Sequence, residues 1–162
     1  MEQAITVYLA GPLFTQAEWQ WNKFLASELR NLNLDIILPQ ETSQSMLSGT
    51  ESFTAKRIFS NNLSDIERAD VVIAILDQPD PDSGTCWECG YAYNLRIPII
   101  GLLTDLRLLP NAPEGAASLN LMLEMSCKEI LKIPSTNRED VVFIAAELAK
   151  IINTVPSKNS RT

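Results

Sequence analysis

A chain of 162 residues is long enough for one domain with a sizeable hydrophobic core. Its 13 basic and 20 acidic residues give a net charge of −7, and the scattered basic residues exclude a surface that binds nucleic-acid polymers. No apolar run approaches the ~20 residues that cross a bilayer, and the N-terminus lacks the features of a signal peptide. We therefore expect a soluble, cytoplasmic protein without a membrane partner.

The sequence contains three cysteines and no histidine, which limits the chemistry available. A zinc site would lack a good fourth ligand, and histidine acid–base catalysis is excluded. Cys86 and Cys89 have the C-x-x-C spacing of a redox pair, but the Trp-Cys-Gly-Pro-like turn that usually surrounds such a pair is missing. We predict no metal and no cofactor.

Apolar runs and helical periodicities alternate along the chain. Residues 5–10 form a short apolar run closed by Gly11-Pro12, which predicts a buried strand, and Thr15 and Glu18 have the spacing of a capping box at a helix start. The same alternation predicts the remaining elements: a helix to about residue 31, a strand at 35–38, a polar loop at 40–50, a helix at 52–68, a strand at 71–76, a helix at 85–95, a strand at 97–103, a short helix at 119–125, a strand at 129–133 and a helix at 138–152.

Strands that alternate with helices indicate an α/β fold. The simplest arrangement is a single-domain, flavodoxin-like, doubly wound parallel sheet of five strands in the order 2-1-3-4-5, flanked by helices. We predict that this domain spans residues 1–154 and that residues 155–162 form a disordered tail. Ligands of such sheets bind beyond the carboxyl ends of the strands where the winding reverses, here between the strands at 5–10 and 71–76.

The loops that meet at this point bring acidic side chains together. Asp77 and Asp82 follow the third strand, Glu88 lies in the next helix, and Tyr8 belongs to the first strand. Glu88 follows Thr85 by three residues, so it could simply complete a capping box. Alternatively, the helix dipole and free amides keep Glu88 ionised, and its carboxylate attacks an anomeric carbon while Asp82 assists the leaving group.

Five segments carry a more specific pattern: YLAGPLF at 8–14, ADVVIAILD at 69–77, DSGTCWECGYA at 82–92, PIIGLLTD at 98–105 and NLM at 120–122. In this order they resemble the nucleoside 2-deoxyribosyltransferase family. The resemblance implies an enzyme of nucleotide salvage that cleaves the N-glycosidic bond of a 2′-deoxynucleoside. It would hold deoxyribose on a glutamate as an ester and pass the sugar to another free nucleobase, with water as a slow acceptor.

The same resemblance implies roles for individual residues. Glu88 would be the nucleophile, Tyr8 would orient its carboxylate, and Asp82 would protonate the nucleobase. Asn120 and Met122 would reach into the site of a neighbouring subunit, which implies a homo-oligomer with shared active sites. The other residues expected to bind substrate are Gly11, Pro12, Phe14, Asn62, Asp77 and Gly84.

One position departs from the family. Members often carry an aspartate near the sugar where this chain has Asn62. An asparagine can hydrogen-bond a hydroxyl group but cannot accept a proton. Asp65 lies one helical turn further along and could compensate for the change.

Two alternative functions remain. A 2′-deoxynucleoside 5′-monophosphate N-glycosidase has a similar fold, but it needs a phosphate site, and the loop from Gly11 to Phe14 has no cation and few free amides. A non-enzymatic nucleotide-binding or signalling module could use Asp77 as a phosphoacceptor. Residues 10–15, however, lack the acidic pair that such a site needs.

Overall fold

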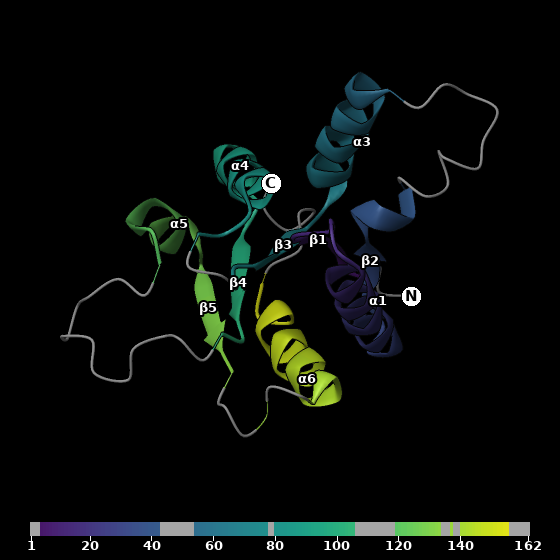
Figure 1. Ribbon diagram of the computed structural model, residues 1–162. Helices are drawn as coiled ribbons and strands as arrows, with labels where there is room; N and C mark the ends of the chain where they lie inside the picture. Colours follow the sequence, from purple (N-terminus) through teal and green to yellow (C-terminus); the bar gives the residue numbers. More distant parts are fainter. Residues whose placement is uncertain are drawn as a thin grey trace.

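The computed structural model describes residues 4–42, 54–77, 80–105, 119–133, 137 and 140–155, and every structural statement below concerns these residues. Its five strands form one parallel sheet in the order β2-β1-β3-β4-β5 (Figure 1), which confirms the predicted fold class and strand order. The elements in chain order are β1 (Thr6–Ala10), α1 (Gln16–Asn31), β2 (Asp35–Ile37), α3 (Ala55–Arg68), β3 (Val71–Ile75), α4 (Ser83–Asn94), β4 (Ile99–Leu103), α5 (Leu121–Ser126), β5 (Glu129–Lys132) and α6 (Val141–Ile152).

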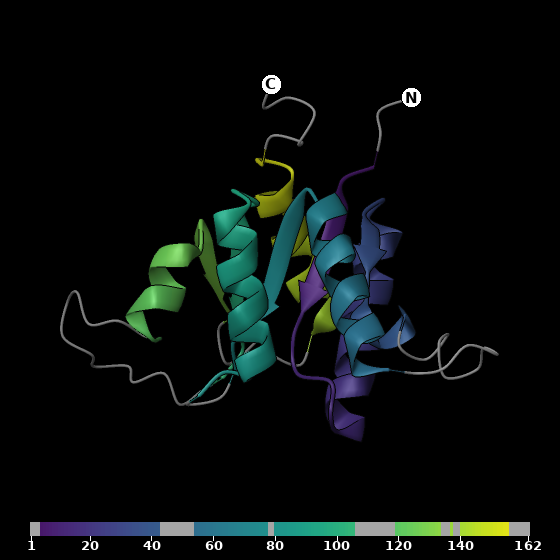
Figure 2. The same ribbon diagram turned by 90° about the horizontal axis from the view of Figure 1, so that it is seen from above.

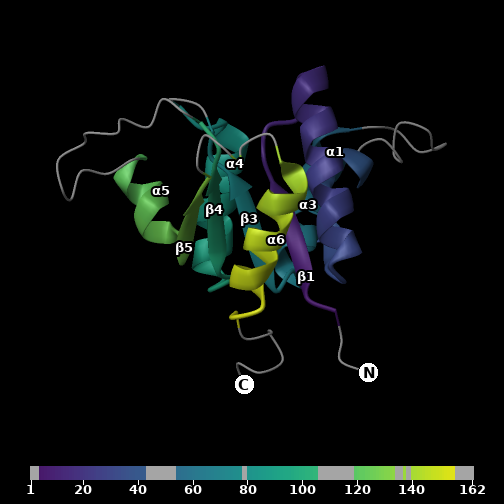
Figure 3. The same cartoon turned by 90° about the horizontal axis from the view of Figure 1, so that it is seen from below.

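Alternate residues of β3 divide the hydrophobic core into two layers. Val71, Ile73 and Ile75 pack with α1 and α6, whereas Val72 and Ala74 pack with α3 and α4. Figures 2 and 3 show these two groups of helices on opposite faces of the sheet, with α5 beside α4. Because both faces are covered, the central strand is a continuous apolar run without polar alternation.

The two edge strands are short and carry exposed charges. β2 pairs with β1 only from Asp35, opposite Thr6, to Ile37, opposite Tyr8. β5 has four residues, and the side chains at both of its ends, Glu129 and Lys132, are exposed. The shortest pairing of the sheet is therefore that of β1 with β2, three residue pairs against four in each of the other pairings.

The local start signals of the helices explain where the sequence predictions hold and where they fail. The capping box of Thr15 and Glu18 is confirmed at the start of α1. In contrast, α4 begins at Ser83, two residues before the predicted start, because the Asp82 carboxylate accepts the Thr85 backbone N–H at 2.8 Å and caps the helix.

Two predicted irregular segments also differ from the structure. Residues 40–42, expected in a polar loop, are helical, and residues 43–50 lie outside the described part of the chain. Val155, expected in a disordered tail, is only 5% exposed, and residues 156–162 lie outside the description. Within the described ranges, no helix has the length and apolar character of a membrane span.

Side chains of α1 form hydrogen bonds with the loop that follows β1 and hold it in place. The Asn22 side-chain amide donates to the Pro12 carbonyl at 2.9 Å and to the Gln40 side chain at 3.2 Å. The Trp19 indole N–H donates to the Leu13 carbonyl at 2.5 Å. Asn22 and Gln40 are both buried, so this network fixes the loop against α1 and against the segment that follows β2.

Gly11 leads to the first testable prediction, because it lies where this loop approaches β3. A Cβ atom on Gly11 would lie 2.9 Å from Ile75 Cδ1 and 3.2 Å from Ile75 Cβ. We expect Gly11→Ala to lower the free energy of unfolding by about 1–3 kcal/mol through overpacking, measured by urea denaturation. Gly90→Ala is the matched control, because no atom lies within 4 Å of its added methyl group. Equal stability of the Gly11→Ala variant and the wild type would contradict the close approach.

Candidate active site

The carboxylate of Glu88 is the centre of the candidate site. The Tyr8 hydroxyl donates to Glu88 Oε1 at 2.7 Å, and the Asn62 side-chain amide donates to the same oxygen at 3.5 Å. These three side chains come from β1, α3 and α4. Glu88 Oε2 has no hydrogen bond with any described residue, so one carboxylate oxygen is held and the other is available to react.

The packing of α3 and α4 on the sheet explains why these residues meet. Tyr8 is fully buried and points to the same face of the sheet as Ala10, toward the core formed with the two helices. In α4, Thr85, Cys89 and Ala92 form the buried stripe, and Glu88 lies beside that stripe. Strand β1 thus presents the Tyr8 phenol to a carboxylate that α4 partly buries.

Burial sets the charge state of this pair. The pKa of Glu88 is raised from 4.5 to about 7, mainly by burial. The hydrogen bonds from Tyr8 and Asn62 oppose this rise, and the negative charge of Asp82 contributes to it. Burial also raises the pKa of Tyr8 far above its usual value, and the charge of Glu88 adds to that effect. Tyr8 therefore remains a hydrogen-bond donor throughout the neutral pH range.

The placement of Glu88 at the helix start, which both sequence-based interpretations assumed, is wrong. Glu88 is the sixth residue of α4, beyond the first turn, so it is neither a capping-box partner nor held ionised by free amides. Asp82 already accepts the backbone N–H of Thr85 through its side chain and that of Cys86 through its carbonyl oxygen, at 2.8 and 2.9 Å.

Asp82 and Gly84 lie at the start of α4, and Asp82 caps this helix. Asp82 Oδ2 accepts the backbone N–H of Thr85 at 2.8 Å and its hydroxyl at 3.2 Å. A Cβ atom at Gly84 would lie 3.0 Å from the same oxygen, so the glycine leaves room for the capping carboxylate. Asp82 is close enough for its charge to raise the pKa of Glu88.

Asp77 joins the ends of two strands. Its carboxylate accepts the backbone N–H of Thr104 at 2.6 Å, the Thr104 hydroxyl at 2.7 Å and the backbone N–H of Asp105 at 2.9 Å. Sequence reasoning named Asp77 as a substrate-binding residue or, in another interpretation, as a phosphoacceptor. With both oxygens bonded, its carboxylate fastens the end of β3 to the end of β4.

Three other predicted site residues lie in the loop after β1. Gly11 and Pro12 pack against the sheet and α1, and Pro12 is buried. Phe14 is 77% exposed, and its backbone N–H donates to the Glu18 carboxylate at 2.9 Å. None of the three forms a hydrogen bond with Glu88 among the described residues.

Asn120 and Met122 lie apart from Glu88, at the start of α5. The Asn120 side chain accepts the Met122 backbone N–H at 2.9 Å and caps this helix. Met122 is 78% exposed, and its neighbours Leu121 and Met125 are also exposed. α5 lies on the other side of α4 from α3 (Figure 1), and neither Asn120 nor Met122 forms a hydrogen bond with Glu88 among the described residues.

Asp65 is a buried carboxylate that sequence reasoning named only as a substitute for Asn62. It is 9% exposed, and its Oδ1 accepts the Arg68 side-chain Nε–H at 3.0 Å. Its Oδ2 has no hydrogen-bond partner in the described part of the chain. Its charge contributes to the raised pKa of Tyr8. The signal in the sequence is the i, i+3 spacing of Asp65 with both Asn62 and Arg68.

The three cysteines do not supply a nucleophile. Burial raises the pKa of the Cys89 thiol to about 12 and also raises the pKa values of Cys86 and Cys127. A raised pKa lowers the fraction of thiolate, the nucleophilic form, at neutral pH. Among the described residues, no three Cys, Asp or Glu side chains are grouped so that they could hold a metal ion.

Comparison with known proteins extends this picture. The chain is 36% identical over 100 residues to an uncharacterised protein of Ureaplasma parvum serovar 3. The aligned region covers 56% of this chain and 61% of that protein. A crystal structure of a conserved protein from Enterococcus faecalis V583 has 26% sequence identity and a TM-score of 0.68, covering 90% of this chain and 99% of that one.

A 2-deoxyribosyltransferase from Bacillus psychrosaccharolyticus has a similar structure, with 27% identity and a TM-score of 0.62 over 85% of this chain and 90% of that one. Residues 7–132 match the family model described as nucleoside 2-deoxyribosyltransferase. The matched range includes β1, α3 and α4 and therefore all three residues that meet at the Glu88 carboxylate. The chain belongs to the nucleoside 2-deoxyribosyltransferase family.

Proposed function

We propose that this protein transfers 2-deoxyribose from one nucleobase to another through a deoxyribosyl ester on Glu88. A lone pair of Glu88 Oε2 forms a bond to the anomeric carbon, and the C–N bond breaks with its electron pair passing to the base. Asp82 relays a proton from water to the departing base, so the base leaves neutral and Asp82 ends as the carboxylate it began as. A second base then reverses these steps, and water replaces it as a slow acceptor.

The observation that carries the proposal is the asymmetric binding of the Glu88 carboxylate. Both protein hydrogen bonds, from Tyr8 and Asn62, go to Oε1. This arrangement supports a nucleophilic role because it fixes the orientation of the carboxylate and leaves Oε2 unbonded by described residues. Burial further supports it, since a partly desolvated carboxylate with a pKa of about 7 is a stronger base than an exposed one.

Asp65 fits this function as a positioning residue. It is a buried anion on α3, one turn beyond Asn62, and its charge favours the protonated phenol of Tyr8. A protonated Tyr8 is the donor that Glu88 requires. Asp65 would thus act on the nucleophile through Tyr8, without touching the substrate.

The charge around Glu88 favours neutral nucleosides over nucleoside monophosphates. Asp82 and Asp65 add negative charge around Glu88, and the guanidinium of Arg68 forms an ion pair with Asp65. In the loop after β1, the Pro12 carbonyl and the Phe14 N–H are already bonded to α1. The described residues therefore offer little to a 5′-phosphate, which disfavours the N-glycosidase alternative.

The proposal includes an active site that is shared between two copies of the chain. Exposed apolar side chains of α5, including Met122 and Met125, offer a surface on which a second copy of the chain can pack. We propose that Asn120 and Met122 enter the neighbour's site and contact the sugar and the nucleophile. The exposure of Met122 supports this role because a core methionine would be buried.

The proposed reaction leads to a prediction for Glu88. Glu88→Gln keeps the shape of the side chain but removes the nucleophile, so we expect at least about a thousandfold loss of turnover. The assay follows deoxyadenosine formed from deoxyinosine and adenine. Glu28→Gln, an exchange in α1 far from the site, is the control and should keep full activity. Near-wild-type transfer by Glu88→Gln would remove the proposed nucleophile, whereas deoxyinosine 5′-monophosphate as the preferred substrate would favour the N-glycosidase.

The pH dependence provides a second prediction, for Tyr8. Because Glu88 attacks as the carboxylate, wild-type kcat/KM should rise with pH and reach half its plateau near pH 7. Tyr8→Phe removes a hydrogen bond that lowers the pKa of Glu88, so the midpoint should move upward by about 1–2 pH units. Tyr93→Phe, at an exposed phenol of α4, is the control. An unchanged midpoint in Tyr8→Phe would contradict the coupling between the two side chains.

The shared site is testable by mixing inactive variants. Glu88→Ala and Asn120→Ala protomers should each be inactive, and mixing should restore some activity because one hybrid site has both intact residues. Asn120→Ala also removes a helix cap, so Asp140→Ala, which removes the cap of α6, is the control and should remain active. A fully active monomer in light scattering at assay concentration would refute sharing.

A further inference from the structure

The outer surface of α3, α4 and α5, here called the α3–α4–α5 face, carries most of the exposed apolar side chains of the described chain. Seven of the eleven large apolar side chains that are exposed belong to these helices or to the residue that ends α4. Figures 1 and 2 show α4 between α5 and α3, on the same side of the sheet. Exposed apolar side chains that gather on one face indicate a surface for contact with another molecule.

The outer side of α4 lacks charge. Its exposed residues include Trp87, Gly90 and Asn94, which follow each other at helical spacing, and none of its exposed residues is charged. Glu88, the one charged residue in the sequence of α4, is half-buried. Exposed charges of this face, such as that of Arg68, belong to α3 at its edge. An uncharged centre with charges at the edge is the composition of a protein–protein interface.

The two sides of α4 carry different apolar side chains. Every exposed residue of α5 is large and apolar, namely Leu121, Met122 and Met125. On the other side of α4, Phe59 of α3 and Trp87 of α4 are each 50% exposed, with ring centroids 5.5 Å apart. Methionine side chains adapt their shape and pack well on aromatic rings. The methionine side of this face is therefore complementary to its aromatic side.

The aromatic side is already ordered within one chain. The ring of Trp87 stacks on that of Tyr91, with centroids 5.5 Å apart and 17° between the planes. The Tyr91 hydroxyl in turn donates to the Glu67 carboxylate at 2.6 Å. Side chains that are held in place before association lose less conformational entropy when a partner binds. These rings thus form a preorganised contact surface.

Gly90 lies in the middle of the outer side of α4. No atom of the described chain lies within 4 Å of a Cβ atom added at this position, so packing within one chain does not require a glycine. A glycine inside a helix lowers its stability relative to alanine. Two helices approach each other closely where the side chains at their contact are small. A glycine here therefore suits a position where a helix of another molecule crosses α4.

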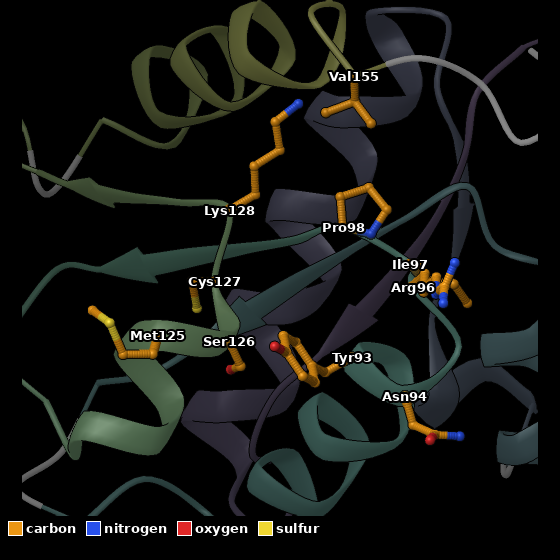
Figure 4. Close-up of a pocket in the computed structure, with 10 residues that line it drawn as sticks. All are labelled: Tyr93, Asn94, Arg96, Ile97, Pro98, Met125, Ser126, Cys127, Lys128 and Val155. Atoms are coloured by element: carbon orange, nitrogen blue, oxygen red, sulfur yellow. The ribbon is translucent and has the colours of Figure 1, made fainter. Parts of the chain in front are cut away.

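The area of the face is sufficient for a stable pair. Its seven large apolar side chains are 38–78% exposed and present roughly 100 Å² each, on the order of 700 Å² in total. A standard interface uses about 800 Å² of each partner. A hollow of about 710 Å³ lies where the end of α4 meets α5, and Figure 4 shows Tyr93, Met125 and Ser126 around it. The face thus combines protruding side chains with a concave part.

We propose that two copies of this chain associate through the α3–α4–α5 face, about a two-fold axis that runs along α4. Rotation about this axis exchanges the two sides of α4, so the α5 methionines of each copy pack on Phe59 and Trp87 of the other, and both contacts form twice. Met122 thereby reaches the α3 side of the neighbour's α4, where Asn62 binds the Glu88 carboxylate. The inference deepens the shared site proposed above and rests on that proposal for the role of Met122.

The test is sedimentation velocity of the full chain without substrate, over a range of protein concentrations. We expect a wild-type dimer, or a larger assembly that contains this pair. Gly90→Gln places a long neutral side chain at the crossing, and Met125→Gln removes a contact of α5, so each should raise the dissociation constant at least tenfold. Glutamine forms helices better than glycine, and the added Cβ meets no described atom, so circular dichroism of Gly90→Gln should match the wild type.

Phe24→Gln is the matched control, because it removes an exposed apolar side chain of α1 on the opposite side of the sheet and should leave the dissociation constant unchanged. Three results would overturn the inference: a monomeric wild type at every concentration, wild-type association of both Gly90→Gln and Met125→Gln, or equal weakening by Phe24→Gln. Because no substrate is present, these results are independent of the transfer reaction. A chain that associates as expected but transfers no deoxyribose would refute only the proposed function.

Discussion

The hydrogen bond between the buried phenol of Tyr8 and the buried carboxylate of Glu88 is the interaction on which the site depends. A carboxylate taken out of water loses solvation, and the rise of its pKa from 4.5 to about 7 corresponds to about 3 kcal/mol. Tyr8 limits this cost because it donates to the carboxylate at 2.7 Å. Folding therefore favours protonated Glu88, and this contribution to stability is full below pH 4.5 and lost as the pH rises through about 7. The site keeps a reactive group at the expense of some stability.

Several polar residues near the site mainly hold the ends of helices and strands in place. Asp82 caps α4, Asp77 binds the end of β4, and Asn120 caps α5. Each uses an oxygen to satisfy backbone N–H groups that no regular hydrogen-bond ladder reaches. The carboxylate of Glu88, the proposed nucleophile, differs from them because its partners are side chains. Around Glu88, hydrogen bonds to backbone N–H groups therefore hold the surrounding helix and strand ends in place. Two side-chain donors, Tyr8 and Asn62, bind the carboxylate itself.

Local sequence patterns predicted most of the fold. The pKa of Glu88, in contrast, depends on the packing of segments far apart in the chain. The alternation of apolar runs and helical periodicities was sufficient for the five strands and their order, and the spacing of Thr15 and Glu18 for the start of α1. The periodicity did not show that Asp82, three residues before the expected start, would cap α4. This misplaced Glu88 relative to the helix start, and the periodicity did not show that burial would raise the pKa of its carboxyl group. The burial of Asp65, Asn22 and Gln40 likewise depends on segments far apart in the chain.

The edge strands constrain how copies of this chain can associate. A strand edge offers unpaired backbone groups, and proteins protect such edges with short strands and charged side chains. β2 has three residues, and β5 has four with exposed Glu129 and Lys132 at its ends. Extension of the sheet from one copy to the next would thus pair few residues and desolvate charges. Contacts between copies are instead favoured through the outer surfaces of helices, so an assembly of this protein would keep each five-stranded sheet separate.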